Sequence, residues 1–572
     1  MTSGGSAGDG GTTDRTPSDR VDVCVVGAGP AGSLVAHRLA AAGHEVVVLE
    51  AGERFDPADR RARMERAIRP AHDGGSVWGM GGERDRFTSA GERFYPLNSA
   101  RVKGVGGSTL HWQGMVMRLH EKDFRLHSTW GVGVDWPVSY RDLQPYYARA
   151  ERALGVAGAD DNPFAPPRER PFPMPAFEPS HSDSLFAPAC ERLGIATHSV
   201  PNARNSEAYD DRPTCQGYGT CQPVCPSGAK YDATVHARKA EAAGARVIDR
   251  APVQRLEHDR AGDRVEAAVY ATPDGTQHRQ EARAFVVACG GVESPRLLLL
   301  SRSEEHPDGL ANSSGAVGRY FTEHLFAGVG GRLDRPTRQN QVGFNTTESH
   351  QFYDDPRAPF GPERGSADAT GTGADGGDPA DRPVPDEDPG LSSIKLEFLN
   401  YAGPSPVELA LGADEWGDDL LESLREAYGS ALAVGGLVGQ LPRKDNRIEL
   451  DPSTTDDHGN PVPEVHWRVG DRAARTVERA NGIQRAVLEE MNAEVTWTVG
   501  PADTGPAFHH MGTTRMGADP ATSVVNARCR THDLANLWIS GSSVFPTGGA
   551  MNPTLTIAAL ALRIADHVDE AL

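Results

Sequence analysis

The sequence predicts an α/β protein whose ordered part begins with a strand–helix–strand unit. A run of β-branched residues, VDVCVV (21–26), leads into the glycine turn GAGPAG (27–32). The segment SLVAHRLAAAG (33–43) then has helical spacing and ends in glycine, and EVVVLE (45–50) is a second apolar run. This order is typical of the β-α-β unit that opens a Rossmann-like domain with a parallel sheet.

Gly27, Gly29 and Gly32 form the pattern GxGxxG between the first strand and the first helix. The first glycine permits the tight turn, the second lets the backbone approach a pyrophosphate, and the third allows close packing of the helix on the strand. Glu50 ends the second strand, where a carboxylate can accept hydrogen bonds from a ribose. We therefore expect a dinucleotide site rather than a merely glycine-rich turn. The acid disfavours NADP but does not separate FAD from NAD.

The later elements follow from the same patterns of apolar spacing. We expect two strands in 245–259, a buried strand in 282–291 that runs into a glycine turn, a helix from 292, a strand in 536–546 and a final helix within 548–568. Residues 160–180 are rich in proline and are expected to be extended.

Two segments are too polar to offset the entropy lost on ordering. They are a disordered N-terminal lead at 1–20 and a disordered acidic insertion at 365–390. The lead has no apolar stretch of the kind that a secretion signal needs, so we expect a cytoplasmic protein. The best candidate for a membrane span, 556–564, is short and is broken by Arg563, so no transmembrane segment is expected.

The chain is strongly acidic, with a formal net charge of −21. This charge argues against a nucleic-acid partner, because phosphate binding requires basic stripes on the protein surface. Only 6 of the 58 basic residues are Lys and 52 are Arg, and excess carboxylate keeps a surface hydrated in high salt. This composition favours a halophilic source over the alternative, a GC-rich genome with an ordinary acidic protein.

Three of the seven cysteines lie within 11 residues, at Cys215, Cys221 and Cys225, in the spacing C-x5-C-x3-C. The odd number and the scatter of the others do not indicate a disulfide framework. Crowded thiolates are soft ligands that suit an iron–sulfur cluster or zinc. A zinc site would need a fourth ligand, for which His236 is the candidate. The remaining alternative is a set of unliganded structural thiols.

Several motifs together resemble the glucose–methanol–choline (GMC) oxidoreductases, most closely the branch of pyranose oxidase and the sugar and gluconate dehydrogenases. The motifs are GAGPAG with Glu50, VGGSTLHW (105–112), ACGGVESPRLLL (288–299), VGRYFTEH (317–324), HHMGTTRMG (509–517) and NPTLT (552–556). The resemblance implies an FAD-binding domain assembled from 21–330 and 476–572. It also implies a substrate domain at 331–475 that is built on an antiparallel sheet.

The resemblance further implies the catalytic residues. His509, three residues before Gly512, corresponds to the catalytic base of the family, and imidazole is suited to take a hydroxyl proton near neutral pH. Asn552 corresponds to the residue that orients the substrate oxygen. Neighbours on an extended backbone point to opposite faces, so we expect His510 to be a packing residue. The alternative for Asn552 is a loop-capping role before Pro553.

Other positions are implied to contact the flavin. In some members a histidine at the place of His111 is bonded covalently to the flavin; the alternative is that His111 only packs beside Trp112. The resemblance also implies a three-iron cluster near Cys215, Cys221 and Cys225. The expected cofactor-binding residues are Gly27, Gly29, Gly32, Glu50, Gly106, Gly107, Ser108, His111, Val253, Ala288, Gly541, Asn552 and Thr554.

The activity implied is FAD-dependent oxidation of a CH–OH group in a sugar, sugar acid or other alcohol, with hydride transfer to flavin N5. A cluster would favour a dehydrogenase that passes electrons to an acceptor protein or small subunit. Three alternatives stay open: an oxidase that uses oxygen and forms hydrogen peroxide, a non-redox lyase with FAD as scaffold, and an electron-transferring subunit.

Overall fold

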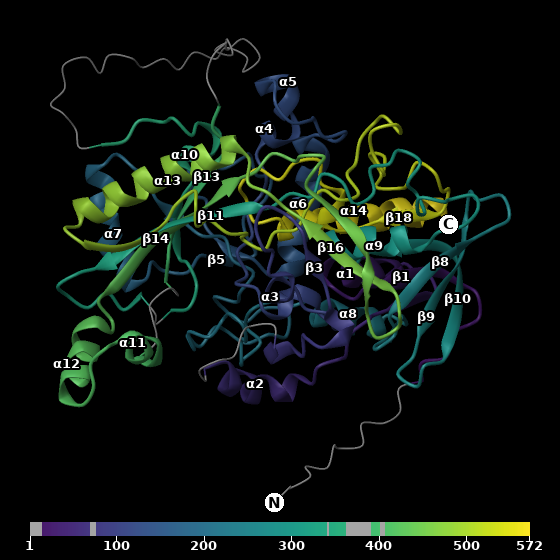
Figure 1. The fold of residues 1–572 in the computed structure, drawn as a ribbon, viewed down its shortest axis with the longest axis horizontal. Coiled ribbons are helices and arrows are strands. Elements are labelled where there is room, and N and C mark those ends of the chain that lie inside the picture. Colours follow the sequence, from purple (N-terminus) through teal and green to yellow (C-terminus); the bar gives the residue numbers. More distant parts are fainter. Residues whose placement is uncertain (1–13, 69–75, 340–341, 362–389, 401–405) are drawn as a thin grey trace, which may run out of the picture.

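The computed structural model describes residues 14–68, 76–339, 342–361, 390–400 and 406–572. Of the predicted insertion 365–390, all but Gly390 lies outside the described residues, as does the predicted lead up to residue 13. Two separate sheets, one largely parallel and one antiparallel, organise the described part of the chain (Figure 1). The predicted α/β class with a second domain on an antiparallel sheet is confirmed.

The first sheet has seven strands in the order β7-β2-β1-β10-β9-β8, with β18 paired to β10. Its parallel part contains β7 (Arg246–Ile248), β2 (Val46–Leu49), β1 (Val21–Val26), the second half of β10 (Gln277–Val287) and β18 (Leu537–Ile539). The first half of β10 pairs antiparallel with β9 (Val265–Ala271), which pairs with β8 (Val253–His258). Strands from the N-terminal, middle and C-terminal parts of the chain therefore share one sheet.

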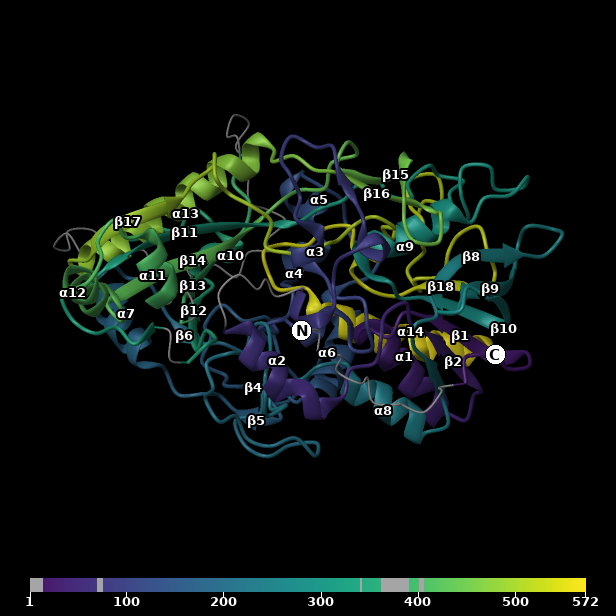
Figure 2. The same ribbon diagram turned by 60° about the horizontal axis from the view of Figure 1, so that its bottom comes forward.

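Helices bury the apolar residues of this sheet. The helices α1 (Pro30–Ala41), α8 (Thr234–Ala242), α6 (Tyr140–Leu154) and α14 (Thr554–Ala571) pack together beside it (Figure 2). Val23 and Val25 of β1 lie on one face of this sheet and are fully buried, as expected for a parallel sheet whose faces are covered. The last helix of the chain thus packs against the first, which brings the residues before α14 to the glycine turn.

The second sheet has the order β17-β11-β14-β13-β12-β6 and is antiparallel. Its strands are β6 (His198–Ser199), β11 (His324–Arg332), β12 (Thr347–Ser349), β13 (Ile394–Phe398), β14 (Ala431–Gly439) and β17 (Glu494–Val499). The helix α13 (Asp471–Glu490) lies across it and presents Val477, Ile483 and Val487, which recur at helical spacing, to a hydrophobic core of its own (Figure 1).

This sheet draws on residues outside the predicted segment 331–475. The strands β6 and β17 lie wholly outside it, and β11 begins at His324. The composition could not predict which strands join this sheet, because strand pairing depends on register between distant segments and not on local sequence.

Single elements differ from the predictions in length. The strand β10 begins at Gln277 because its first half extends a hairpin with β9, and β18 ends at Ile539 because Ser542–Val544 form a tight turn. The helix α9 (Gly290–Leu300) and the strands β7 and β8 are as expected. Residues 160–180 contain no helix and only the short strand β5 (Met174–Pro175), which pairs with β4 (Ala157–Gly158).

Residues 14–20 of the predicted disordered lead are packed against the first sheet. The Arg15 guanidinium pairs with Asp249 at 2.9 Å, and the Tyr270 hydroxyl donates to the Arg15 carbonyl. The Ser18 N–H donates to the side chain of Gln280 at 2.9 Å. Specific partners on β9 and β10 therefore order a segment whose composition predicts disorder.

The remaining elements are short. A third sheet contains β3 (Thr88–Ser89), β15 (Arg447–Thr455) and β16 (Pro461–His466), and α9 packs against its last two strands. The other helices are α2 (Arg60–Ala67), α3 (Leu97–Ala100), α4 (Glu121–Phe124), α5 (Leu126–Trp130), α7 (His181–Arg192), α10 (Gln351–Asp354), α11 (Pro406–Gly412) and α12 (Asp418–Ala427). Among the described residues, no helix combines the length and the apolar character that crossing a bilayer requires.

Two glycine-to-alanine substitutions should have opposite effects on stability. A methyl group on Gly32 would lie 1.9 Å from the Gly27 carbonyl oxygen, so Gly32→Ala should lower the free energy of unfolding by several kcal/mol or prevent folding. Gly482, inside α13, has open space around its missing Cβ, so Gly482→Ala should raise that free energy by up to ~1 kcal/mol. Urea unfolding measures both; equal stability of the two variants would contradict the packing described.

Candidate active site

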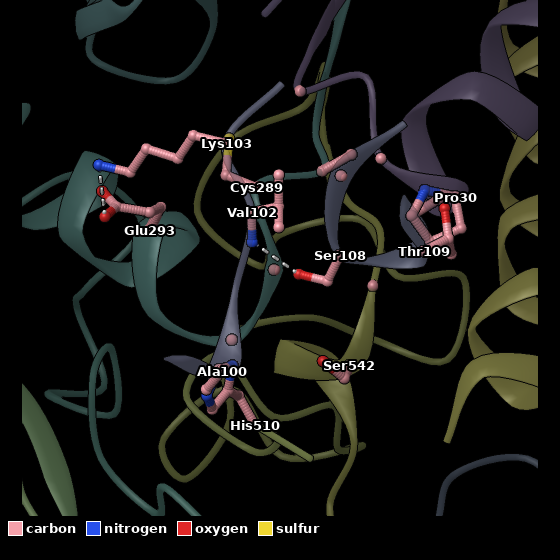
Figure 3. Close-up of a pocket in the computed structure, with 18 of the residues that line it drawn as sticks. Pro30, Ala100, Val102, Lys103, Ser108, Thr109, Cys289, Glu293, His510 and Ser542 are labelled. Atoms are coloured by element: carbon pink, nitrogen blue, oxygen red, sulfur yellow. Dashed lines mark hydrogen bonds and ion pairs between the residues drawn. The ribbon is translucent and has the colours of Figure 1, made fainter. Parts of the chain in front are cut away.

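A cavity of about 550 Å³ lies where the glycine turn, the second sheet and the C-terminal segments meet. It brings together residues that are hundreds of positions apart in the chain; Figure 3 shows Pro30, Ser108, Glu293, His510 and Ser542 around it. The predicted residues that line it are Gly27, Gly29, Glu50, Gly107, Ser108, His111, Val253, Ala288, His509, Gly541, Asn552 and Thr554. Gly32 and Gly106 do not line the cavity, but they pack against the glycine turn that does.

Two glycine segments pack backbone to backbone at one end of the cavity. Gly27 has a φ of +101°, and a Cβ there would lie 2.7 Å from the Ala288 carbonyl oxygen. A Cβ on Gly107 would lie 2.8 Å from the Cα of Gly29, and the Gly106 N–H donates to the Ala28 carbonyl at 3.0 Å. No side chain caps the N-terminus of α1, which leaves its N–H groups available to an anionic pyrophosphate.

Glu50 is buried in the wall of the cavity, where it holds the glycine turn. Its carboxylate accepts hydrogen bonds from the Ala28 N–H at 2.7 Å and from the Gly52 N–H at 2.9 Å. Burial raises the pKa of this carboxyl, against the effect of the two N–H donors. Each carboxylate oxygen has a second lone pair, so contact with a ribose stays compatible with these bonds and remains a prediction.

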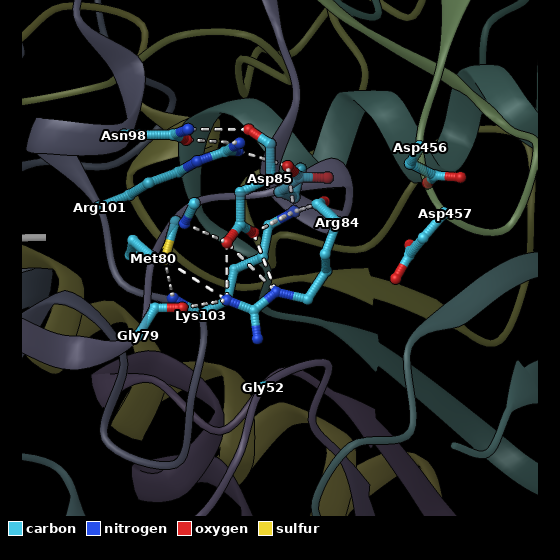
Figure 4. Close-up of polar contacts among 12 residues, drawn as sticks. Gly52, Gly79, Met80, Arg84, Asp85, Asn98, Arg101, Lys103, Asp456 and Asp457 are labelled. Atoms are coloured by element: carbon cyan, nitrogen blue, oxygen red, sulfur yellow. Dashed lines mark hydrogen bonds and ion pairs between the residues drawn. The ribbon is translucent and has the colours of Figure 1, made fainter. Parts of the chain in front are cut away.

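The same end of the cavity is lined by charged groups that are already paired. Arg84 contacts Asp85 at 2.6 Å, Lys103 contacts Glu293 at 3.2 Å, and Figure 4 shows Asp456 and Asp457 on the facing segment. Arg296, from α9, reaches Asp456 at 2.6 Å. The carboxylate partners offset the charge of these cations, and the uncapped N–H groups at the start of α1 remain available to a phosphate.

His509 and His510 both line the cavity but have different neighbours. The His509 ring faces the second sheet, where its Nδ1 lies 3.0 Å from Nδ1 of His324. The His510 ring packs against Tyr95 and Phe321, as expected for a packing residue. His510 also lines the cavity, near Ala100 (Figure 3), and which of the two histidines meets the flavin stays a prediction.

Hydrogen bonds determine which nitrogen of His509 is basic. The Gly548 carbonyl can only accept, so His324 donates to it from Nε2 at 3.0 Å and accepts with Nδ1. His509 must then donate to His324 from Nδ1. This leaves the lone pair of His509 on Nε2, which lies 3.4 Å from Nδ2 of Asn552.

Burial keeps both imidazoles neutral. It lowers the pKa of His324 to about 4, and it lowers the pKa of His509 well below its usual value, with further lowering from His324 and Lys395. A neutral His509 can accept a proton, and Asn552 beside it has an amide N–H but no basic group.

Glu323 joins the two histidine segments through the backbone. One oxygen of its carboxyl accepts from the His509 N–H at 2.7 Å and from the His324 N–H at 3.1 Å. The hydroxyl of Tyr95 contacts the other oxygen. Neither Glu323 nor His324 was among the predicted site residues, although both end the motif VGRYFTEH that carried part of the resemblance.

The cysteine segment lies directly behind the cavity wall. The Lys230 ammonium donates to the carbonyls of Leu110, Trp112 and Cys221, so one buried side chain ties the segment beside His111 to the cysteines. Burial raises the pKa of the Cys225 thiol, but the N–H and the ammonium of Lys230 outweigh it and lower this pKa overall.

The sulfur atoms do not form a compact tetrahedral set. Among the described residues, the groups of metal-ligating atoms that lie within 4.8 Å of one another do not include Cys215, Cys221 and Cys225. Zinc–sulfur bonds of about 2.3 Å would bring its ligands closer than this, whereas an iron–sulfur cluster separates its ligands by its own core. His236, the candidate fourth zinc ligand, bonds instead to Tyr231 at 2.9 Å.

A glycine cradle for a dinucleotide and a neutral, buried imidazole at the other end of one cavity define a nucleotide-dependent oxidoreductase. Residues 25–326 and 442–561 match the two family descriptions of GMC oxidoreductases. The chain belongs to the GMC oxidoreductase family, and it is an FAD-dependent enzyme that acts on CH–OH donors.

The relatives and a solved structure agree with this assignment. The chain is 34% identical to the fructose dehydrogenase large subunit of Gluconobacter japonicus, over 96% of this chain and 97% of that protein. It is 30% identical to 2-methyl-1,2-propanediol dehydrogenase of Mycolicibacterium austroafricanum, over 97% and 96%. A formate oxidase variant of Aspergillus oryzae has the same fold, with a TM-score of 0.65 at 15% identity over 97% of this chain and 99% of that one.

Glu323 should make the stability of the protein depend on pH. Burial raises the pKa of its carboxyl to about 8. The folded chain therefore holds this proton more tightly than the unfolded chain, and the stability that it contributes is lost as the pH rises through about 8. Glu323→Gln does not titrate, so its Tm relative to wild type should rise between about pH 5 and about pH 9. The same difference in Tm at both pH values would contradict a raised pKa.

Proposed function

We propose that this protein is a dehydrogenase that oxidises a CH–OH group of a sugar or another alcohol, with His509 as the base. The observation that carries the proposal is the lone pair of His509 Nε2 at the cavity, whose contact there is with Nδ2 of the Asn552 amide at 3.4 Å. FAD supplies the acceptor for the hydride when it is bound.

The residues at the cavity fit FAD. The positive φ of Gly27 and the close approach of Gly29 to Gly107 make a wall of bare backbone, against which a pyrophosphate can lie. Val253, Ala288, Gly541 and Thr554 line the same cavity. His111 also lines it, and burial lowers the pKa of its imidazole to about 4, so the ring is neutral. A covalent bond from His111 to the flavin stays a prediction.

The substrate hydroxyl would lie within hydrogen-bond reach of both Nε2 of His509 and Nδ2 of Asn552. The imidazole takes the hydroxyl proton, and the amide N–H donates to the substrate oxygen and so orients the reacting carbon. The imidazolium that forms donates from Nδ1 to His324. His324 is neutral and can accept this bond, because burial lowers the pKa of its imidazole to about 4.

We further propose that Cys215, Cys221 and Cys225 hold an iron–sulfur cluster that takes electrons onward to an acceptor protein or small subunit. Two features support this: Lys230 lowers the pKa of Cys225, and the same lysine ties the cysteine segment to the cavity wall. The relative named as a large subunit fits the expectation of a partner.

Replacing His509 should stop flavin reduction without loss of the flavin. Under anaerobic conditions, the fastest donor from a panel of fructose, glucose, gluconate and 2-methyl-1,2-propanediol should bleach the wild type. We expect His509→Ala to bleach about 10²–10⁴-fold more slowly, because the hydroxyl proton has no acceptor. The control is His181→Ala at an exposed position. Reduction of His509→Ala at the parental rate would refute the base assignment.

The outcome in air separates the alternatives. A reduced enzyme that is stable in air but is reoxidised by a dye is a dehydrogenase. Rapid reoxidation with formation of hydrogen peroxide would show an oxidase, and cleavage of a donor without bleaching would show a lyase.

Metal analysis tests the cysteine proposal. Anaerobically purified wild type should contain iron and acid-labile sulfide, and Cys225→Ser should lose most of both while retaining FAD. Cys190→Ser is the matched control, because Cys190 is a buried thiol of α7. Absence of iron and sulfide from the wild type would leave the three cysteines as structural thiols.

A further inference from the structure

Lys395 is a buried cation that the proposed mechanism does not use. It lies on β13, with a side chain that is 0% exposed. Its ammonium is 2.6 Å from Oδ1 of Asn552, 2.7 Å from Oε1 of Glu397 and 3.6 Å from Oε2 of Glu348. An uncompensated cation at this depth would be costly, and these oxygens compensate the charge of the ammonium.

The contact with Asn552 decides which way its amide faces. An ammonium carries three N–H donors and no acceptor, so it can bond only to the oxygen of the amide. With Oδ1 held by Lys395, Nδ2 faces Nε2 of His509. The opposite orientation would place the amide NH2 against the ammonium and the amide oxygen against the lone pair of His509, and both contacts are repulsive.

We propose that Lys395 is the positioning residue that locks the Asn552 amide with its N–H groups toward His509 and the substrate oxygen, an inference that rests on the proposed function. Without this cation, the preference between the two orientations of Asn552 is weaker, because only the contact with His509 still favours the one observed. In the orientation that Lys395 opposes, no amide N–H points to the substrate oxygen. The amide oxygen then competes with His509 for the hydroxyl proton.

The lysine is itself held by the second sheet. Lys395 and Glu397 are two residues apart on β13 and therefore share a face of the sheet, and Glu397 also accepts from Nδ2 of Asn345 at 3.1 Å. Glu348 lies on the neighbouring strand β12, in register with Glu397. The pairing of β12 with β13 thus fixes the position of the Lys395 ammonium against Asn552, which lies just before α14 in the other domain.

The charge of Lys395 also reaches His509 through space. The ionisable groups that face His509 are His324 on β11, Glu323 just before that strand, Lys395 on β13 and His510 beside it in the chain. A nearby cation disfavours the imidazolium, so the loss of Lys395 should raise the pKa of His509. The acid limb of the pH profile of kcat should then move to higher pH.

The test compares Lys395→Met with Lys122→Met. Lys122 is a second largely buried lysine, which contacts Ser393 and Asp354 and not Asn552. With the fastest donor of the panel, we expect Lys395→Met to lower kcat on the order of 100-fold, with a smaller change in KM. The acid limb should move up in Lys395→Met and stay in place in Lys395→Arg, which keeps the charge. Lys122→Met should retain the parental kcat and acid limb.

A double-mutant cycle shows whether Lys395 acts through Asn552. In an Asn552→Ala background there is no amide to orient, so Lys395→Met should cost less than about 3-fold in kcat, while the shift of the acid limb persists. The same 100-fold loss in both backgrounds would overturn the proposal, as would a Lys395→Met variant that behaves like Lys122→Met.

The experiment distinguishes failure of the proposed function from failure of the inference about Lys395. If Lys395→Met does not retain flavin, Lys395→Met/Glu348→Gln restores the local charge balance, and the cycle is measured in that background. If no CH–OH donor bleaches the wild type, the proposed function fails and the role of Lys395 fails with it. If donors bleach the wild type and His509→Ala is inactive but the cycle is additive, only the inference about Lys395 is overturned.

Discussion

The contact between Nδ1 of His324 and Nδ1 of His509 is the constraint on which the site depends. It joins β11 of the antiparallel sheet to the segment that precedes the last strand of the parallel sheet. Because one nitrogen must donate and the other accept, the Gly548 carbonyl on the far side of His324 sets the protonation of both rings. The lone pair at the cavity thus follows from a backbone carbonyl on the far side of His324.

Burial and hydrogen bonding have separate roles around this contact. Burial keeps His324 and His509 neutral, whereas hydrogen bonds decide where their protons lie. Glu323 fixes the backbone N–H groups of both histidines, and it is the group whose own titration this burial displaces most clearly toward neutral pH. A neutral imidazole held in place by these hydrogen bonds is what the proposed proton abstraction from an alcohol requires.

The resemblance to the family located much of the site before any coordinates. The GxGxxG turn, Glu50, His111, His509 and Asn552 come from motifs, and the structure places them around one cavity. His324, Glu323 and Lys395 were missed. The first two end a motif whose residues were compared for similarity and not for chemistry. Lys395 lies between the two segments, 25–326 and 442–561, that match the family.

The sequence by itself determined the β-α-β unit, the glycine turn and the family, because these depend on local spacing that neighbouring residues specify. It also predicted an antiparallel second sheet, through the resemblance and not through strand patterns. Only the tertiary structure decided that β6 and β17 join that sheet, that residues 14–20 are packed, and that Lys395 faces Asn552. These facts depend on which distant strands pair and in which register, and a one-residue slip would turn Lys395 to the other face of the sheet.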